Sequence, residues 1–363
     1  MISKILKEDI DFTLSMLTNA EKAKFENSTI LITGCGGFVG FYLMNFFKEN
    51  MNVLKIKKVV GLDNFILGYP KWLNAFASDD RFEIKKFDII SDHIENIPGS
   101  NKVDYVIHMA SIASPSFYRK YPIETLDANV WGLRSLLEFY KEKSIKGFLF
   151  FSSSEVYGNP DKDHIPTNED YLGHVSFTGP RACYDESKRF GETMCMLFSQ
   201  KYKMPIGVVR PFNNYGPGMK LDDKRVPADF ARAVVNNEDI EILSGGSPTR
   251  TFAYISDAVA GYLKILLYGS YDYFNIGINS PEISIFELAK IYEKIGREIF
   301  SYTGKVKYSK PKEENYLKDN PQRRCPDITK ARKILGYDPK IYVEEGVERF
   351  LKFLKENNGD AYL

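Results

Sequence analysis

Apolar residues occur along this chain in short runs that alternate with longer amphipathic stretches. From Thr29 the run TILITG ends in glycine, and the following GFVGFYLMNFFKEN places its apolar residues at helical spacing. Further short runs follow at KVVGLD, FEIKKFD, VDYVIHMA, GFLFF and PIGVVRP, with helical stretches at 122–143 and 184–201. Because short buried runs alternate with helices, the pattern predicts an α/β fold: a doubly wound, Rossmann-type parallel sheet with helices on both faces.

The same pattern divides the chain into three regions. Residues 1–28 are polar with helical spacing, and we expect them to form an N-terminal helical extension. Residues 29–215 carry the alternating strands and helices of the Rossmann domain. Beyond 215 the alternation weakens, although 285–297 and 343–355 have amphipathic helical spacing. We expect residues 216–363 to form a smaller C-terminal lobe, from which the chain crosses back to the Rossmann domain.

Composition and charge exclude several classes of protein. The 363 residues are 44% hydrophobic and 27% charged, which is ordinary for a globular chain, and the net charge of +1 creates no field that attracts nucleic acid or a membrane. The N-terminus lacks the apolar run of a signal peptide, and no stretch of about 18 apolar residues is free of charge. The four cysteines form no CxxC pair, which argues against disulfides and zinc. We expect a cytoplasmic protein without a metal, membrane or nucleic-acid partner.

A glycine-rich loop follows the first predicted strand and opens the first helix. Gly34, Gly37 and Gly40 form a GxxGxxG pattern that permits positive φ and close approach of a pyrophosphate to the helix N-terminus. Asp63 closes the second strand, where its carboxylate can bind an adenosine ribose and repel a 2′-phosphate. The sequence therefore predicts that 29–215 binds NAD rather than NADP. Further contacts are expected from Phe38, Val39, Asn64, Asp88, Ile89, Met109, Ala110 and Ser111.

Asp88 has two interpretations. It ends the third predicted strand, so that its carboxylate either contacts the adenine or caps the turn that follows. The sequence leaves both open.

A tyrosine and a lysine lie four residues apart on a predicted helix. Tyr184 and Lys188 therefore project from one face, one turn apart. A free phenol has a pKa near ~10, and a nearby ammonium together with the positive nicotinamide of NAD stabilises the phenolate. Such a tyrosine can take the proton of a sugar hydroxyl while NAD accepts the hydride. The pair indicates a dehydrogenase-type active site. Tyr184 and Lys188 are also expected to contact the cofactor. We therefore expect the lobe formed by residues 216–363 to bind the substrate.

Polar residues also follow the apolar run GFLFF. Ser153, Ser154 and Glu155 come at the carboxyl end of a predicted strand, which is where ligands bind in doubly wound folds. The serines either contact the substrate or cap the next turn. Glu155 is a candidate acid–base group, or a group that orients one.

Eight segments occur in the order found in a known family. The chain resembles extended short-chain dehydrogenase/reductases, specifically the nucleotide-sugar enzymes, from about Thr29 to the C-terminus. The stretch GHVSFTGPRACYDESKRFGETMC is especially similar to UDP-glucuronate decarboxylases. The resemblance implies NAD as cofactor, a UDP-sugar as substrate, and a homodimer that pairs through two helices per subunit, including 184–201. The segments are GCGGFVG, LDNF, HMASIASP, SSSEVYG, GPRACYDESKR, RPFNNYGPGM, TRTFAYISD and NPQRRCPDITKARKILGY.

The resemblance also implies roles for individual residues. Related 4,6-dehydratases carry Asp-Glu at the position of Ser154-Glu155. The decarboxylases carry Ser-Glu, as this chain does, because a uronic acid needs no leaving-group acid at C6. Arg324 occupies the family's position before a proline and is implied to hold the C6 carboxylate. Cys325, which follows it, stands where lysine or glutamine is expected. The segment RPFNNYGPGM also differs from the usual decarboxylase version.

Three more residues are implied to bind the nucleotide pyrophosphate: Asn213, Arg225 and Arg250. The expected reaction converts UDP-glucuronate to UDP-xylose and CO₂ through a 4-keto intermediate, with NAD regenerated. A 4,6-dehydratase or 4-epimerase on the same scaffold is an alternative, as is a decarboxylase that releases the 4-keto pentose and NADH. A non-catalytic nucleotide-binding regulator is a further alternative, against which the intact Tyr184–Lys188 pair and Glu155 argue.

Overall fold

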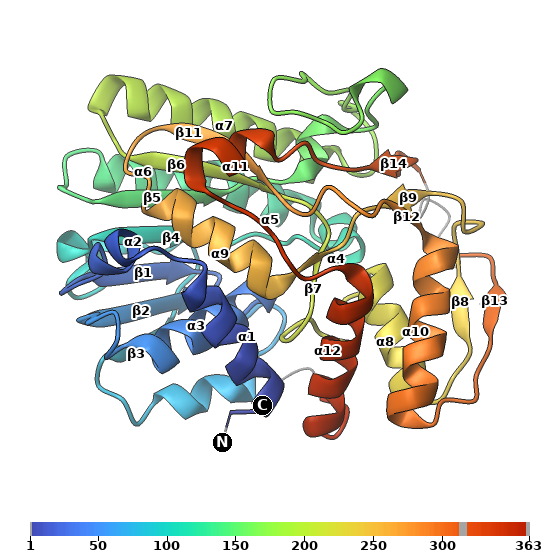
Figure 1. The fold of residues 1–363 in the computed structure, drawn as a ribbon. Helices are drawn as coiled ribbons and strands as arrows, with labels where there is room; N and C mark the ends of the chain where they lie inside the picture. The colour runs from blue at the N-terminus through green and yellow to red at the C-terminus, as the bar shows by residue number, and fades with distance from the viewer. Residues whose placement is uncertain (1, 312–317, 361–363) are drawn as a thin grey trace.

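The computed structural model describes residues 2–311 and 318–360, which form an α/β/α arrangement around one sheet (Figure 1). The sheet has seven parallel strands in the order β11-β6-β5-β4-β1-β2-β3. β1 lies between β2 and β4, with Ile30 paired to Val59 on one side and Tyr105 on the other. The expected Rossmann-type fold is confirmed. The strands are β1 (Thr29–Thr33), β2 (Lys58–Asp63), β3 (Phe82–Lys86), β4 (Tyr105–His108), β5 (Gly147–Phe151), β6 (Ile206–Pro211) and β11 (Asp272–Ile276).

Helices cover both faces of the sheet (Figure 1). One face carries α1 (Lys4–Ser15), α3 (Phe38–Asn50) and α9 (Ile255–Leu266), and the other carries α5 (Pro122–Asp127), α6 (Leu133–Tyr140) and α7 (Ala182–Tyr202). The expected helical stretch at 122–143 is confirmed as α5 and α6, which a π-helical turn at Ala128–Gly132 joins without a gap. Within that turn the Asn129 amide donates a hydrogen bond to Ser187 of α7 over 2.9 Å, a contact between helices that sequence spacing does not reveal.

The chain beyond residue 215 builds two things. It supplies α9 and β11 to the sheet layers, and it forms the smaller group of elements seen beyond the end of the sheet in Figure 1. No helix among the described residues has the length and apolarity needed to cross a membrane. The remaining elements are α2 (Asn19–Ala23), α4 (Pro115–Lys120), β7 (Asn214–Tyr215), α8 (Val226–Val235), β8 (Ile240–Ile242), β9 (Thr249–Arg250), β10 (Ala253–Tyr254), β12 (Ile283–Ser284), α10 (Ile285–Phe300), β13 (Val306–Tyr308), β14 (Arg323–Arg324), α11 (Thr329–Leu335) and α12 (Val343–Glu356).

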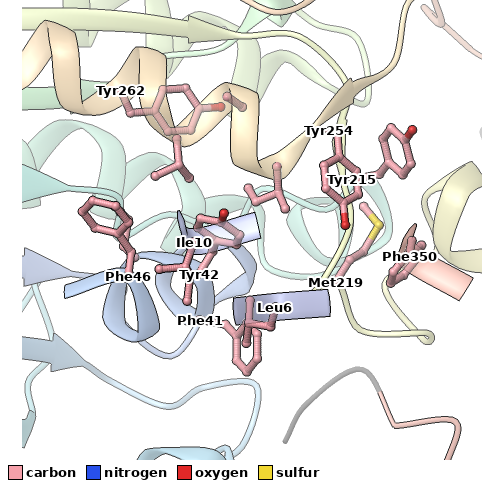
Figure 2. Close-up of a cluster of buried hydrophobic side chains, with 14 of the residues drawn as sticks. Leu6, Ile10, Phe41, Tyr42, Phe46, Tyr215, Met219, Tyr254, Tyr262 and Phe350 are labelled. Carbon is pink, nitrogen blue, oxygen red and sulfur yellow. The ribbon is translucent and has the colours of Figure 1, made fainter. Parts of the chain in front are cut away.

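The N-terminal helix α1 is part of the hydrophobic core. Its apolar side, with Leu6 and Ile10, packs in the same buried cluster as side chains of α3, α9 and α12 (Figure 2). The buried Asp9 accepts hydrogen bonds from Tyr254 (2.6 Å) and from Arg349 of α12 (2.7 Å). α1 therefore ties α3 and α9, which cover one face of the sheet, to α12.

Candidate active site

A cavity of about 760 Å³ lies at the carboxyl ends of the sheet strands. Parallel strands bring their carboxyl ends to one edge, so segments far apart in the chain meet there. Every residue that the sequence marks as a candidate lines this cavity. These residues are Gly34, Gly37, Phe38, Val39, Gly40, Asp63, Asn64, Asp88, Ile89, Met109, Ala110, Ser111, Ser153, Ser154, Glu155, Tyr184, Lys188, Asn213, Arg225, Arg250 and Arg324.

The glycine loop forms one end of the cavity. Gly34 has a φ of +75°, and a Cβ there would lie 2.9 Å from the Ala110 nitrogen, so only glycine fits without strain. Gly37 caps α3 without a side chain, which leaves the helix N-terminus open to an anion. The Asp63 carboxylate accepts hydrogen bonds from the Gly36 and Phe65 nitrogens (2.9 and 2.8 Å) and is held beside the loop. These residues fit a dinucleotide: a side-chain-free cradle for the pyrophosphate and a carboxylate for a ribose.

Asp88 caps a turn. Its Oδ1 accepts a hydrogen bond from the Ile90 nitrogen over 2.9 Å, and its Oδ2 accepts one from the Asn64 amide over 3.3 Å. Because Asp88 also lines the cavity, a contact with the adenine stays a prediction beside this capping role.

Tyr184 and Lys188 face the cavity from the first turns of α7 and are both buried. The Lys188 ammonium donates a hydrogen bond to the Phe151 carbonyl at the end of β5 over 2.7 Å, and it lies 5.7 Å from the centre of the Tyr184 ring. The Ser153 hydroxyl hydrogen-bonds to Tyr184, whose ring stacks on that of Tyr118 with centres 5.1 Å apart. The side chains of the predicted catalytic pair are therefore fixed by packing and by the end of β5.

Burial controls the acidity of this pair in the protein alone. Burial raises the pKa of Tyr184 to about 12, with the charges of Glu155 and Asp185 adding to the rise, and it lowers the pKa of Lys188 to about 7. In the protein alone, desolvation outweighs the hydrogen bond from Ser153, and the expected stabilisation of the phenolate by Lys188 together with the nicotinamide of NAD stays a prediction. A positive charge brought by a ligand would be needed to lower the pKa of Tyr184.

Glu155 is the centre of a buried ion cluster. Arg324 donates two hydrogen bonds to its carboxylate, one from Nη2 to Oε2 over 2.8 Å and one from Nη1 to Oε1. Nη2 of Arg181 contacts the same Oε2. Burial opposes ionisation of Glu155, yet the two guanidinium groups hold the pKa of this carboxyl well below its usual range. Glu155 is therefore an anion at neutral pH.

Arg181 is a site residue that the sequence reasoning missed. It stands three residues before Tyr184, at the N-cap of α7, and it is 6% exposed. The spacing carries a signal, since residues three apart on a helix lie on one side. It could have been found in the segment GPRACY.

The three candidates for pyrophosphate binding already have protein partners. The Arg250 guanidinium donates to the carbonyl oxygens of Thr249 (2.7 Å), Gln322 (3.1 Å) and Pro321 (2.5 Å). Arg225 forms an ion pair with Asp223, with Nη2 2.9 Å from Oδ2, and the Asn213 amide donates to the Thr251 carbonyl over 2.9 Å. A bound phosphate would have to exchange with these partners, so their role stays a prediction.

Comparisons with known proteins agree with this geometry. Residues 30–277 match the model of the NAD dependent epimerase/dehydratase family. UDP-glucuronic acid decarboxylase 1 of Xenopus tropicalis is 33% identical over 331 residues, which cover 91% of this chain and 73% of that protein. UDP-glucuronic acid decarboxylase 5 of Arabidopsis thaliana is 35% identical over 321 residues, 88% of this chain and 87% of that protein. The crystal structure of UDP-glucose 4-epimerase from Thermotoga maritima with UDP-glucose has a TM-score of 0.77 at 25% identity, covering 91% of this chain and 99% of that one.

Proposed function

We propose that this chain, which belongs to the NAD dependent epimerase/dehydratase family, decarboxylates UDP-glucuronate to UDP-xylose. The chain is an NAD-dependent enzyme of that family. The reaction is balanced by one proton: the C6 carboxylate leaves as CO₂, and a proton takes its place on C5. The observation that carries the proposal is the Arg181–Glu155–Arg324 cluster, which presents two guanidinium groups in the same cavity as Tyr184.

The first step is oxidation at C4. The glycine loop and Asp63 would hold NAD, which when bound supplies the acceptor and later the donor of the C4 hydride. Tyr184 takes the proton of the 4-hydroxyl at its phenolic oxygen, and Ser153 hydrogen-bonds to that oxygen. Lys188 is held by the Phe151 carbonyl within reach of the Tyr184 ring and stabilises its phenolate.

The second step is loss of CO₂. A ketone at C4 makes the C6 carboxylate part of a β-keto acid, so the electrons of the breaking bond move to the C4 oxygen, where Tyr184 and Ser153 stabilise the charge. Arg324 and Arg181 position the C6 carboxylate. Glu155 holds these two guanidinium groups in place. Its anionic carboxylate lines the same cavity, and we assign it the orientation of a water or of the C5 proton.

The assay uses purified protein with UDP-glucuronate labelled with ¹³C at C6, and follows labelled CO₂ and UDP-xylose. Both products are expected in equal amounts, without net NADH. UDP-galacturonate without CO₂ would identify a 4-epimerase instead, and NADH accumulating with a 4-keto pentose would identify the decarboxylase that does not complete the cycle. Turnover of another nucleotide sugar with none of UDP-glucuronate would refute the proposal.

The assembly that we propose is a homodimer paired through α5 and α7. These helices pack together and expose apolar side chains, among them Ile123 of α5 (66% exposed) and Phe190 of α7 (52%). Light scattering should give twice the chain mass for the wild type and one chain mass for a Phe190→Asp, Leu197→Asp variant. Leu172→Asp, at a loop position outside these helices, is the control that should stay dimeric.

A further inference from the structure

Asp185 is a buried acid beside the catalytic tyrosine that the proposed mechanism does not use. It lies in the first turn of α7 and is 5% exposed. Within residues 2–311 and 318–360, its Oδ1 is buried and has no hydrogen-bond partner, and the same is true of Nε of Arg181. These two groups face each other, with Oδ2 of Asp185 3.6 Å from that Nε. The distance exceeds a hydrogen bond.

Arg181 is shared between two carboxyl groups. Its Nη2 contacts Glu155, whereas its Nε is left at 3.6 Å from Asp185. An ionised Asp185 would be a buried charge without a hydrogen bond, which is costly, and it would compete with Glu155 for the same guanidinium. A neutral Asp185 removes that competition. The observed geometry, with Arg181 committed to Glu155, is the one that a neutral Asp185 favours.

We propose that Asp185 is a positioning residue: while neutral it leaves Arg181 on Glu155 and facing the substrate carboxylate, and once ionised it draws Arg181 back along α7 and weakens the cluster. The inference rests on the proposed decarboxylation for its effect on turnover. If Asp185 acts in this way, the positive charge available to the C6 carboxylate depends on the protonation of Asp185, which does not itself line the cavity.

The groups that face Asp185 come from four elements. Glu155 lies in the turn after β5, Arg324 on β14, Tyr118 on α4, and Arg181 on α7 itself. Burial and the charge of Glu155 raise the pKa of Asp185 to about 8, against the opposing effect of Arg181 and Arg324. The movement of Arg181 from Glu155 towards Asp185 is therefore expected on the alkaline side of neutrality.

The kinetic test compares the wild type with Asp185→Asn, which stays neutral at every pH. For the wild type, kcat/KM for UDP-glucuronate should fall about tenfold between pH 8 and 9, while the Asn variant should lose much less over that interval. Glu186→Gln, the next residue and a partly exposed one, is the control that should follow the wild type. Asp185→Ser, which also has a neutral side chain, should show the same small loss of kcat/KM between pH 8 and 9 as Asp185→Asn. Identical alkaline limbs in the wild type and both neutral variants would overturn the inference.

A stability measurement tests the charge of Asp185 without turnover. Because its folded pKa is raised, its stabilisation is complete below the ordinary value of 3.8 and is lost as the pH rises to about 8. The urea midpoint of the wild type should therefore fall relative to Asp185→Asn between pH 4 and 8. A midpoint that rises instead would show a stabilising ionised Asp185 and overturn the inference. Absence of UDP-glucuronate turnover in the wild type would count against the proposed function alone, and the urea series would still decide the charge of Asp185.

Discussion

Replacing Glu155 by glutamine removes the one negative charge that lies between Arg181 and Arg324 while keeping the size of the side chain. Both arginine side chains are nearly inaccessible, with 8% and 6% of their surface exposed, so water cannot replace the lost carboxylate. Removing one partner from a buried ion pair costs about 3–5 kcal/mol of folding free energy. Asp185 offsets part of this cost, because the charge of Glu155 no longer opposes its ionisation.

We therefore expect Glu155→Gln to lower the free energy of unfolding at pH 7 by about 3 kcal/mol, which for a chain of this length lowers the Tm by about 4 °C. Urea denaturation followed by circular dichroism measures the difference. Glu138→Gln is the control, since Glu138 belongs to an exposed ion pair with Arg134 that contributes under about 1 kcal/mol. The difference in unfolding free energy between the wild type and Glu155→Gln should shrink as the pH falls below about 4.5. A carboxylate whose pKa is lowered in the folded state stabilises the protein fully only above its ordinary pKa, and this stabilisation is lost as the carboxylate is protonated.

A double mutant tests the coupling to Asp185. In the wild-type background Asp185→Asn should be neutral or stabilising at pH 7, but in the Glu155→Gln background it should cost about 1 kcal/mol or more, because there Asp185 supplies the remaining negative charge. Two results would refute the reasoning. One is a Glu155→Gln protein as stable as the Glu138→Gln control, and the other is additivity of the two substitutions.

Three further predictions concern other parts of the molecule. Tyr184→Phe should lower kcat for UDP-glucuronate about 10³-fold, while NAD binding, followed by fluorescence, is unchanged. A variant that turns over at the wild-type rate would show that Tyr184 is not part of the mechanism. Gly40→Ala would place a Cβ 2.3 Å from the Cys35 carbonyl oxygen and should abolish NAD binding and reduce stability, whereas Gly37→Ala, whose nearest contact is 3.4 Å, should fold normally; equal stability of the two would contradict the packing argument. Burial raises the pKa of Asp9 to about 6, so the wild type should lose about 3 kcal/mol of stability relative to Asp9→Asn as the pH rises from about 4 to about 6 in urea titrations, and the opposite trend would contradict it.

The strands and the glycine loop could be predicted from the sequence because their causes are local. TILITG and KVVGLD are buried on both faces of a parallel sheet, and their apolar runs show this directly. Knowing that the strands are parallel also predicts that Asp63, Ser153 and the end of β4 meet at one edge, which is how the cavity is lined. Local patterns combined with one rule of topology were sufficient for the position of the site.

The charges of the site could not be predicted in this way, because they depend on pairing between distant segments. Glu155 and Arg324 are 169 positions apart, and no periodicity indicates that they form a bidentate pair. The ionisation of Tyr184 depends on the depth of its burial, which outweighs the hydrogen bond from Ser153. Similarly, the family resemblance implies that Arg250 binds the pyrophosphate, but it does not indicate that the guanidinium donates to three main-chain carbonyls.

One face of α7 joins the two kinds of chemistry in the site. Arg181, Tyr184, Asp185 and Lys188 follow the spacing i, i+3, i+4, i+7, so they form a stripe along one side of the helix. In the proposed mechanism Tyr184 and Lys188 direct oxidation at C4, a task common to enzymes that move a hydride on a sugar. Arg181, with Asp185 behind it, meets Glu155 and Arg324, which come from other elements. Because Arg181 and Tyr184 start from the same helix, the separation of their backbone positions is set by helix geometry. What distinguishes the reaction therefore comes from the two residues that dock against this stripe.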